Sequence, residues 1–144
     1  LSSFLPVVFK SDEFTISAIL TGHAQDVKCV KWHPNDSLLF SASYDNTIKC
    51  WRYDDNVDDW LCTYTMEGHD STVWQLDFDS TGEFLCSCSD DKTWSVWRMI
   101  NPQNFENKGI ISGCHIRSIF SISWAGSFIA TGASDNRICV FELN

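Results

Sequence analysis

Positive charge is scarce in this sequence. It carries 10 Lys and Arg residues against 19 Asp and Glu residues, which gives a formal net charge of −9. A protein that neutralises many phosphates needs a basic face, so this balance argues against nucleic acid and against anionic membranes as partners. The chain also lacks any apolar run near the ~20 residues that cross a bilayer.

A secretory leader is missing as well. Residues 1–9 are mostly apolar, but no positively charged region precedes them and no small-residue cleavage site follows. Because the chain begins with Leu, we do not expect Leu1 to be a native translation start. We interpret residues 1–14 as an N-terminal extension, either disordered or a linker.

The cysteines lack the spacing of metal sites. None of the seven forms a Cys-x-x-Cys pair, and their spacings match neither zinc sites nor small disulfide scaffolds. We therefore predict reduced thiols that pack as small hydrophobic side chains, which indicates the cytoplasm, with the nucleus as an alternative. These residues are Cys29, Cys50, Cys62, Cys86, Cys88, Cys114 and Cys139.

The apolar spacing of long helices is absent too, and the alternation of strands takes its place. Residues 26–32 alternate with the period of a β-strand. With 44% hydrophobic and 14% aromatic residues, the chain can form one domain with a core. Further strands are predicted at residues 15–20, 38–43, 47–51, 60–66, 73–78, 84–89, 93–97, 119–124, 128–133 and 137–141.

A repeat of about 45 residues fills the chain after residue 14. His23, His69 and His115 are spaced 46 residues apart. An aspartate and an aromatic residue follow each histidine at closely matching distances, namely Asp45 and Trp51, Asp91 and Trp97, and Asp135 and Phe141. Repeats of this length are typical of propeller blades.

These units resemble the WD40 repeat. Gly22-His23 and Gly68-His69 open the first two units. Trp51-Arg52, Trp97-Arg98 and Phe141-Glu142 stand where the usual Trp-Asp pair closes a repeat. The resemblance implies an all-β fold of four-stranded antiparallel β-propeller blades, with repeats at 15–53, 60–98 and 109–144.

One histidine, serine, aspartate and tryptophan per unit can form a buried structural hydrogen-bond tetrad. An unpaired buried polar group costs about 1–3 kcal/mol, so the aspartate should accept from the imidazole and the serine should link to the indole. We assign the tetrads to His23, Ser43, Asp45 and Trp51, and to His69, Ser89, Asp91 and Trp97. The third unit keeps His115 and Asp135, but Ala133 and Phe141 offer neither hydroxyl nor indole, so we expect the weakest blade there.

Recurrence of this set argues against catalysis. A catalytic triad occurs once in a protein, whereas the set recurs in successive units and explains its own burial. His33 is out of register with the repeat, and we expect it to be solvated in a turn beside Pro34. We predict that the protein is not an enzyme.

The WD40 pattern also implies which residues lie on one rim of the blades. Tyr44, Trp74 and Phe120 would place three aromatic side chains there, and interface hot spots are rich in aromatics. The alternative is that Trp74 and Phe120 pack between blades as core residues. The full set of candidate partner-binding rim residues is Asp26, Lys28, Tyr44, Thr72, Trp74, Asp90, Ser118, Phe120 and Ser134.

Several segments also resemble, more narrowly, the family of WD40 subunits of the cytosolic iron–sulfur assembly targeting complex. The resemblance rests on Gln25-Asp-Val-Lys28, on residues 67–74 and on the acidic run before Asp59-Trp60. It implies a seven-bladed scaffold that docks a small assembly factor and a large helical-repeat protein and that recognises apo-protein clients. The alternative is a generic WD40 adaptor, such as a substrate receptor in a ubiquitin ligase or a chromatin complex.

Cofactors and metals are not expected. Cys86 and Cys88 align with Phe, Ala and Gly in the other units, so these are packing positions rather than cluster ligands. The acidic residues 54–59 are interpreted as a solvated connection, with contact to a basic partner as the alternative.

Three blades are too few for a propeller, which needs about four to eight. The predicted strand at 15–20 has no blade of its own, and the third unit stops after its third strand. We expect a piece of a longer protein. Two copies that exchange outer strands would otherwise form a homodimeric six-bladed ring.

Overall fold

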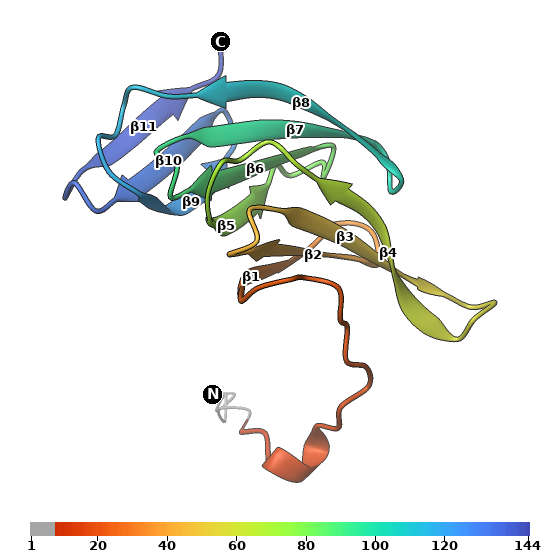
Figure 1. The fold of residues 1–144 in the computed structure, drawn as a ribbon. Coiled ribbons are helices and arrows are strands. Elements are labelled where there is room, and N and C mark those ends of the chain that lie inside the picture. The colour runs from red at the N-terminus through yellow and green to blue at the C-terminus, as the bar shows by residue number, and fades with distance from the viewer. Residues whose placement is uncertain (1–7) are drawn as a thin grey trace, which may run out of the picture.

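The computed structural model describes residues 8–144 as three antiparallel sheets stacked side by side (Figure 1). Blade 1 contains β1 (Val27–Trp32), β2 (Leu38–Ser43), β3 (Ile48–Asp54) and β4 (Asp59–Met66). Blade 2 contains β5 (Val73–Phe78), β6 (Phe84–Ser89), β7 (Trp94–Asn101) and β8 (Asn104–Ile111). Blade 3 contains β9 (Ile119–Ala125), β10 (Phe128–Ala133) and β11 (Ile138–Glu142). In each sheet the strands pair in chain order, which confirms the predicted all-β blade architecture.

The hairpin between the second and third strand of each blade turns in the same way. Asn46, Lys92 and Asn136 adopt the left-handed conformation, with φ of 72°, 70° and 64°. The aspartate before each of them accepts a hydrogen bond from the backbone N–H two residues later, at 3.0 Å from Thr47 to Asp45. This is an Asx-type turn, so the recurring aspartates shape the backbone as well as the core.

Apolar side chains fill the two spaces between neighbouring blades. Phe40, Ile48 and Met66 of blade 1 pack with Leu76 and Leu85 of blade 2. A second cluster joins blade 2 to blade 3 and contains Cys86, Cys88, Trp94, Ile119, Ile122 and Ile129. The two cysteines are fully buried among these side chains, as expected for packing positions.

Asp77 on β5 links all three blades at their inner strands. Its Oδ2 accepts a hydrogen bond from the backbone N–H of Trp124 at 2.7 Å, and its Oδ1 lies 3.2 Å from Lys31 Nζ. Gln75 on the same strand accepts from the N–H of Ile122 at 2.8 Å. The inner strands are therefore held in register by side chains as well as by apolar packing.

Residues 15–20, predicted as an outer strand for a blade outside this chain, form no strand and pair with none of the strands at 27–142. An outer strand needs the free edge of a third strand, and β3 and β7 already pair with β4 and β8. The free third strand is β11, which lies at the far end of the stack from the N-terminal segment (Figure 1). Of the predicted extension 1–14, residues 1–7 lie outside the described part, and Ser11–Glu13 form a short 3₁₀ helix.

The acidic residues 54–59, interpreted as a solvated connection, form the tip of a long hairpin in which residues 55–59 are exposed. β3 and β4 stay paired as far as Asp54 and Asp59. Among residues 8–144, no helix has the length and apolar character needed to span a membrane.

Candidate functional site

The histidines of blades 1 and 2 each form the expected pair with an aspartate. His23 Nδ1 donates to Asp45 Oδ2 at 2.8 Å, and His69 Nδ1 donates to Asp91 Oδ2 at 2.9 Å. Burial of Asp45 opposes its charged form, but hydrogen bonds from Thr47, His23 and Ala24 outweigh burial and hold the pKa of Asp45 well below its ordinary range. Half-burial of Asp91 likewise opposes its charged form, but bonds from His69 and Thr93 outweigh it and lower the pKa of Asp91. Both carboxylates are therefore structural anions.

The serine of each tetrad differs from the prediction. Ser41 Oγ accepts from Trp51 Nε1 at 2.8 Å and donates to His23 Nε2 at 2.6 Å. Ser87 occupies the same place between Trp97 and His69, at 2.9 and 2.8 Å. The assignment of Ser43 and Ser89 to the tetrads was wrong, because each is the last residue of its strand and bonds at the adjacent turn. Their hydroxyls donate to backbone carbonyls of Asp26 and Ser71.

Blade 3 keeps more of the tetrad than expected. His115 Nε2 accepts from Thr131 Oγ1 at 2.8 Å, and His115 Nδ1 lies 3.0 Å from Asp135 Oδ2. Only the indole is missing, because Phe141 replaces it and packs 4.8 Å from the Trp94 ring. The sequence contains a signal for the correct serine, because a hydroxyl residue lies ten residues before the closing aromatic residue in all three units.

Cys114 and Cys139 form a disulfide, which corrects the prediction of seven reduced thiols. Cys114 takes the position before the histidine that Gly22 and Gly68 hold in the other blades. A Cβ at Gly22 would lie 3.0 Å from the Trp51 ring, and blade 3 has no tryptophan in that place. Cys114, His115 and Cys139 also offer potential metal-ligand atoms within 4.8 Å of one another. Both sulfurs are bonded to each other and both imidazole nitrogens are hydrogen-bonded, so this oxidised cluster lacks the thiolates that bind zinc.

His33 is buried between blades 1 and 2, which corrects the prediction of a solvated side chain. It is 6% exposed, and its Nε2 donates to the carbonyl of Gly82 at 2.9 Å. Its Nδ1 accepts from the N–H groups of Asn35 and Asp36. A Cβ at position 82 would lie 2.2 Å from His33 Nε2, and Gly82 has a φ of 75°, so only glycine fits there.

The predicted rim aromatics form a continuous surface across the three blades. Lys28 Nζ lies 5.8 Å from the centre of the Tyr44 ring and 5.3 Å from that of Trp74. Trp74 and Phe120 meet edge to face, with ring centres 5.2 Å apart. We name these four residues, Tyr44, Lys28, Trp74 and Phe120, the aromatic strip.

Charged partners hold the aromatic strip in place. Asp26 Oδ2 lies 3.2 Å from Lys28 Nζ, and Asp90 Oδ1 accepts from Trp74 Nε1 at 3.2 Å. Tyr44 and Phe120 are exposed at 55% and 47%, while Trp74 is half-buried and also packs against the core of blades 2 and 3. The strip is therefore both anchored and accessible.

Three predicted rim residues contribute little exposed surface. Thr72 is buried, and its carbonyl accepts from the N–H of Asp90 at 2.9 Å, so its placement on an exposed rim was wrong. Ser118 and Ser134 are half-buried and are joined by a backbone hydrogen bond of 3.0 Å. They support the turn beside Phe120.

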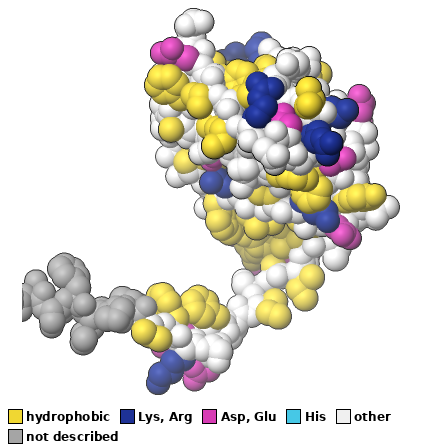
Figure 2. Space-filling view, turned by 90° about the vertical axis from the view of Figure 1, so that its left-hand side faces the viewer, with side chains coloured by type: hydrophobic (Ala, Val, Ile, Leu, Met, Phe, Trp, Pro, Cys, Tyr) yellow, Lys and Arg dark blue, Asp and Glu magenta, His cyan; other side chains and the backbone are white. Residues whose placement is uncertain are grey.

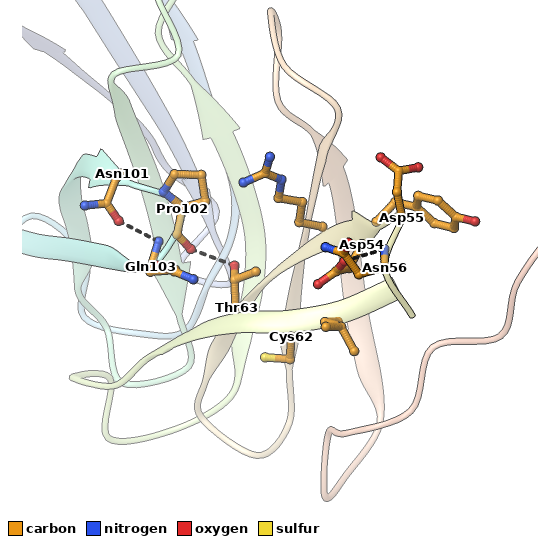
Figure 3. Close-up of a pocket in the computed structure, with 11 residues that line it drawn as sticks. Asp54, Asp55, Asn56, Cys62, Thr63, Asn101, Pro102 and Gln103 are labelled. Carbon is orange, nitrogen blue, oxygen red and sulfur yellow. Dashed lines mark hydrogen bonds between the residues drawn. The ribbon is translucent and has the colours of Figure 1, made fainter. Parts of the chain in front are cut away.

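A polar groove of about 660 Å³ lies between the outer hairpins of blades 1 and 2 (Figure 3). Thr63 of β4 points toward the β7–β8 turn and donates to the carbonyl of Pro102 at 2.6 Å. Asn101 accepts from the N–H of Gln103 at 2.8 Å. Thr63, Asn101, Pro102 and Gln103, which line this groove, are hydrogen-bonded within or between the two hairpins.

A family model for the WD domain, G-beta repeat, matches residues 14–52, 60–98 and 107–142. The chain belongs to the WD40 repeat family. The matched segments cover most of the chain and coincide with the three stacked sheets. In this WD40 chain the His–Asp pairs are parts of the blades themselves, and the aromatic strip crosses from one repeat to the next.

Among curated proteins, this WD40 chain is similar to iron–sulfur assembly proteins. It is 41% identical over 128 residues to a probable cytosolic iron-sulfur protein assembly protein CIAO1 homolog of Ixodes scapularis, covering 86% of the chain and 40% of that relative. It is 39% identical over 110 residues to the probable protein Ciao1 of Aedes aegypti, covering 67% of the chain and 33% of that relative. Pre-mRNA-processing factor 19 of Bos taurus is 32% identical over 142 residues, with 95% and 26% coverage. The chain spans less than half the length of these relatives.

Proposed function

We propose that this WD40 chain belongs to a protein-interaction scaffold that acts in cytosolic iron–sulfur protein assembly. The two relatives named for that process match at 41% and 39% identity, which supports the role and a location in the cytoplasm. The single observation that carries a binding role is the aromatic strip, because it is accessible, continuous across blades and anchored by the hydrogen bonds of Lys28 and Trp74.

The chemistry of the strip suits a protein partner. Aromatic side chains supply large contact area at small entropy cost, and they are enriched where interfaces concentrate their binding energy. The Lys28 ammonium lies over two ring faces and beside Asp26, so its charge is already balanced. The strip therefore favours an apolar segment of the partner, flanked by the carboxylates of Asp26 and Asp90.

The partners we propose are those of the iron–sulfur assembly machinery. They are a small assembly factor, a large helical-repeat protein and the apo-proteins that receive a cluster. We assign no reaction to the chain itself. His23, His69 and His115 each use both ring nitrogens in fixed hydrogen bonds, so none offers a free nitrogen as a general base.

Capture of the helical-repeat protein by the purified scaffold tests this function. We expect Trp74→Ala combined with Phe120→Ala to weaken capture by about thirtyfold or more, because a single hot-spot aromatic contributes at least ~2 kcal/mol. Phe128→Ala is the matched control, since Phe128 has the same exposure of 47% as Phe120 and lies outside the strip. Equal capture by the unsubstituted protein, the double variant and the control would exclude the strip as the docking site.

A generic WD40 adaptor is the second candidate. The match to pre-mRNA-processing factor 19 covers 95% of the chain and supports it. Under this hypothesis the same strip docks clients of another complex, such as a ubiquitin ligase or a chromatin complex. Failure to capture either the helical-repeat protein or the small assembly factor would favour this candidate.

We further propose that the chain works together with additional blades. The outward faces of blades 1 and 3 are apolar and β11 has a free edge, which supports a larger ring of seven blades. If the chain is produced alone, two copies paired head to tail would cover these faces.

A further inference from the structure

The Cys114–Cys139 disulfide ties the beginning of blade 3 to its outermost strand. Cys114 lies five residues before β9, and Cys139 lies within β11. Within residues 8–144, β11 pairs with β10 alone, whereas β3 and β7 also pair with an outer strand. The bond thus closes a loop of 25 residues around the sheet that has the fewest strands.

Cys114 of this bond stands at the position that faces an indole ring in the other two blades. In blades 1 and 2, Gly22 and Gly68 lie against the rings of Trp51 and Trp97, whose N–H groups reach the tetrad serines. In blade 3, Cys114 replaces the glycine and Phe141 replaces the tryptophan. Blades 1 and 2 thus have a glycine packed against an indole ring at this position. Blade 3 has a covalent bond that reduction can break.

The surroundings of the pair differ from those of the buried thiols. Cys114 and Cys139 are partly exposed, and a nitrogen of His115 lies within 4.8 Å of both sulfurs. Burial raises the pKa of the Cys50 thiol to about 11 and that of Cys88 to about 12, so these thiols stay protonated and unreactive. A disulfide that is accessible and next to an imidazole is open to thiol exchange.

We propose that Cys114 and Cys139 form a reversible thiol–disulfide centre that controls how firmly blade 3 is held. Its effect on partner binding rests on the proposed function, because Phe120 of the aromatic strip follows Cys114 by six residues. Disulfides in cytosolic proteins are usually transient or redox-sensing, and this class fits the pair.

The reductant is a dithiol, either a small molecule or a dithiol oxidoreductase. One of its thiolates attacks a sulfur of the pair, breaks the Cys114–Cys139 bond and forms a mixed disulfide. Its second thiol then displaces the protein sulfur and closes the reductant's own disulfide. Two electrons pass to the protein, and two protons end on the thiols of Cys114 and Cys139.

Reduction should loosen blade 3 without unfolding it. The segment before β9 keeps the His115–Asp135 pair, the bond from Ile116 N–H to Asp135 at 3.2 Å and the bond from Ser134 N–H to the Ser118 carbonyl. These bonds hold the turn but do not restrain β11 to the segment at Cys114. Local opening of residues 112–118 should therefore become more frequent.

Trypsin cleavage after Arg117 measures this opening in the protein as expressed. Arg117 is exposed and lies inside the loop closed by the disulfide, while Lys10 in the N-terminal segment is an internal reference. We expect dithiothreitol to accelerate cleavage after Arg117 about tenfold relative to Lys10, since only hydrogen bonds then oppose local opening of this segment. Cys62→Ser should keep this response, because Cys62 is exposed and is a free thiol rather than part of a disulfide.

Cys114→Ser should abolish the response and be cleaved rapidly under both conditions. In case that variant folds poorly, alkylation and mass spectrometry of the unsubstituted protein provide a second measurement. We expect Cys114 and Cys139 to be protected together after glutathione disulfide treatment and released together by dithiothreitol. Free thiols at both positions after oxidation, or cleavage rates that ignore the reductant, would overturn the proposal.

A binding assay separates this inference from the proposed function. We expect reduction to weaken capture of the helical-repeat protein in parallel with faster cleavage after Arg117. If the strip variants capture the partner normally, the proposed docking site is wrong, while the cleavage and alkylation results still decide whether the redox centre exists.

Discussion

The inward and outward faces of the blades share one apolar pattern but differ in burial. Val73 of blade 2 is fully buried, whereas Val27, its counterpart in blade 1, is 52% exposed. Ile48 of blade 1 is 1% exposed, whereas its counterpart in blade 3, Ile138, is 79% exposed. Each repeat thus carries side chains suited to a neighbour on both sides, and the stack supplies both neighbours only to blade 2.

The open face of blade 1 illustrates what a missing neighbour leaves behind. A hollow of about 270 Å³ beside His23 is lined by Val27, Val30 and Trp51. Figure 2 shows hydrophobic side chains gathered at the lower end of the body, where the N-terminal segment joins it. Apolar surface of this kind favours association.

Truncating a side chain should change the free energy of unfolding much more on a face covered by a neighbouring blade than on an open face. Leu76→Ala should lower the free energy of unfolding by about 2–5 kcal/mol, because Leu76 is buried between blades and a cavity would remain. Val30→Ala, at the corresponding exposed position, should change it by less than about 0.5 kcal/mol. Urea unfolding curves measure both, and equal losses would show that the outward face is covered in solution.

Replacing the indole of Trp97 should lower the free energy of unfolding more than replacing that of Trp51, although by less than the core truncation does. Trp97→Phe should cost about 1–3 kcal/mol, since it removes the hydrogen bond to Ser87 and leaves a space in the core between blades 1 and 2. Trp51→Phe breaks the same bond beside the open face, where water can reach the freed hydroxyl, and should cost less. Thermal melting of both variants tests the order.

Acid should weaken covered and open blades alike. The folded-state pKa values of Asp45 and Asp91 lie below the ordinary value of 3.8, so each contributes stability that is present above that value and lost as the pH falls below about 4. Asp91→Asn should be less stable at neutral pH and should lose less on acidification. The unfolding midpoints of the variant and the parent are measured from pH 6 to pH 2.5. An equal fall of both midpoints over this range would contradict the prediction.

The smallest effect on stability is expected at the outward face of blade 3. Ile138→Glu should change the free energy of unfolding by less than about 0.5 kcal/mol because the side chain is exposed. It should nevertheless reduce the self-association of the chain, since it places charge on an apolar face. Sedimentation velocity over a range of concentrations measures this, with Ser80→Glu, an exposed position in the turn between β5 and β6 of blade 2, as the control.

The repeat made the architecture predictable, because each strand signal occurred more than once. The strands predicted at 38–43, 73–78 and 84–89 match β2, β5 and β6 to the residue. Residues 15–20 form no strand here, because a strand needs a free sheet edge to pair with and the local sequence does not show whether one is present. Local periodicity therefore predicts elements well where their partners are also present.

The candidate site was predictable only in part, for physical reasons. Ser41 and Ser43 lie on the same face of one strand, so alternation does not distinguish them, and only Thr131 in the third unit indicates the correct position. The Cys114–Cys139 bond and the burial of His33 depend on contacts between segments far apart in the chain. The aromatic strip was predictable because its residues occupy recurring positions of the repeat.

The contact between His33 and Gly82 has a consequence for how these repeats can change. The imidazole from the first repeat occupies the space that any side chain at position 82 of the second would need. Neither residue can be replaced freely without regard to the other, so the two repeats cannot be exchanged or duplicated as independent modules. The smallest interchangeable part of this protein is longer than one repeat.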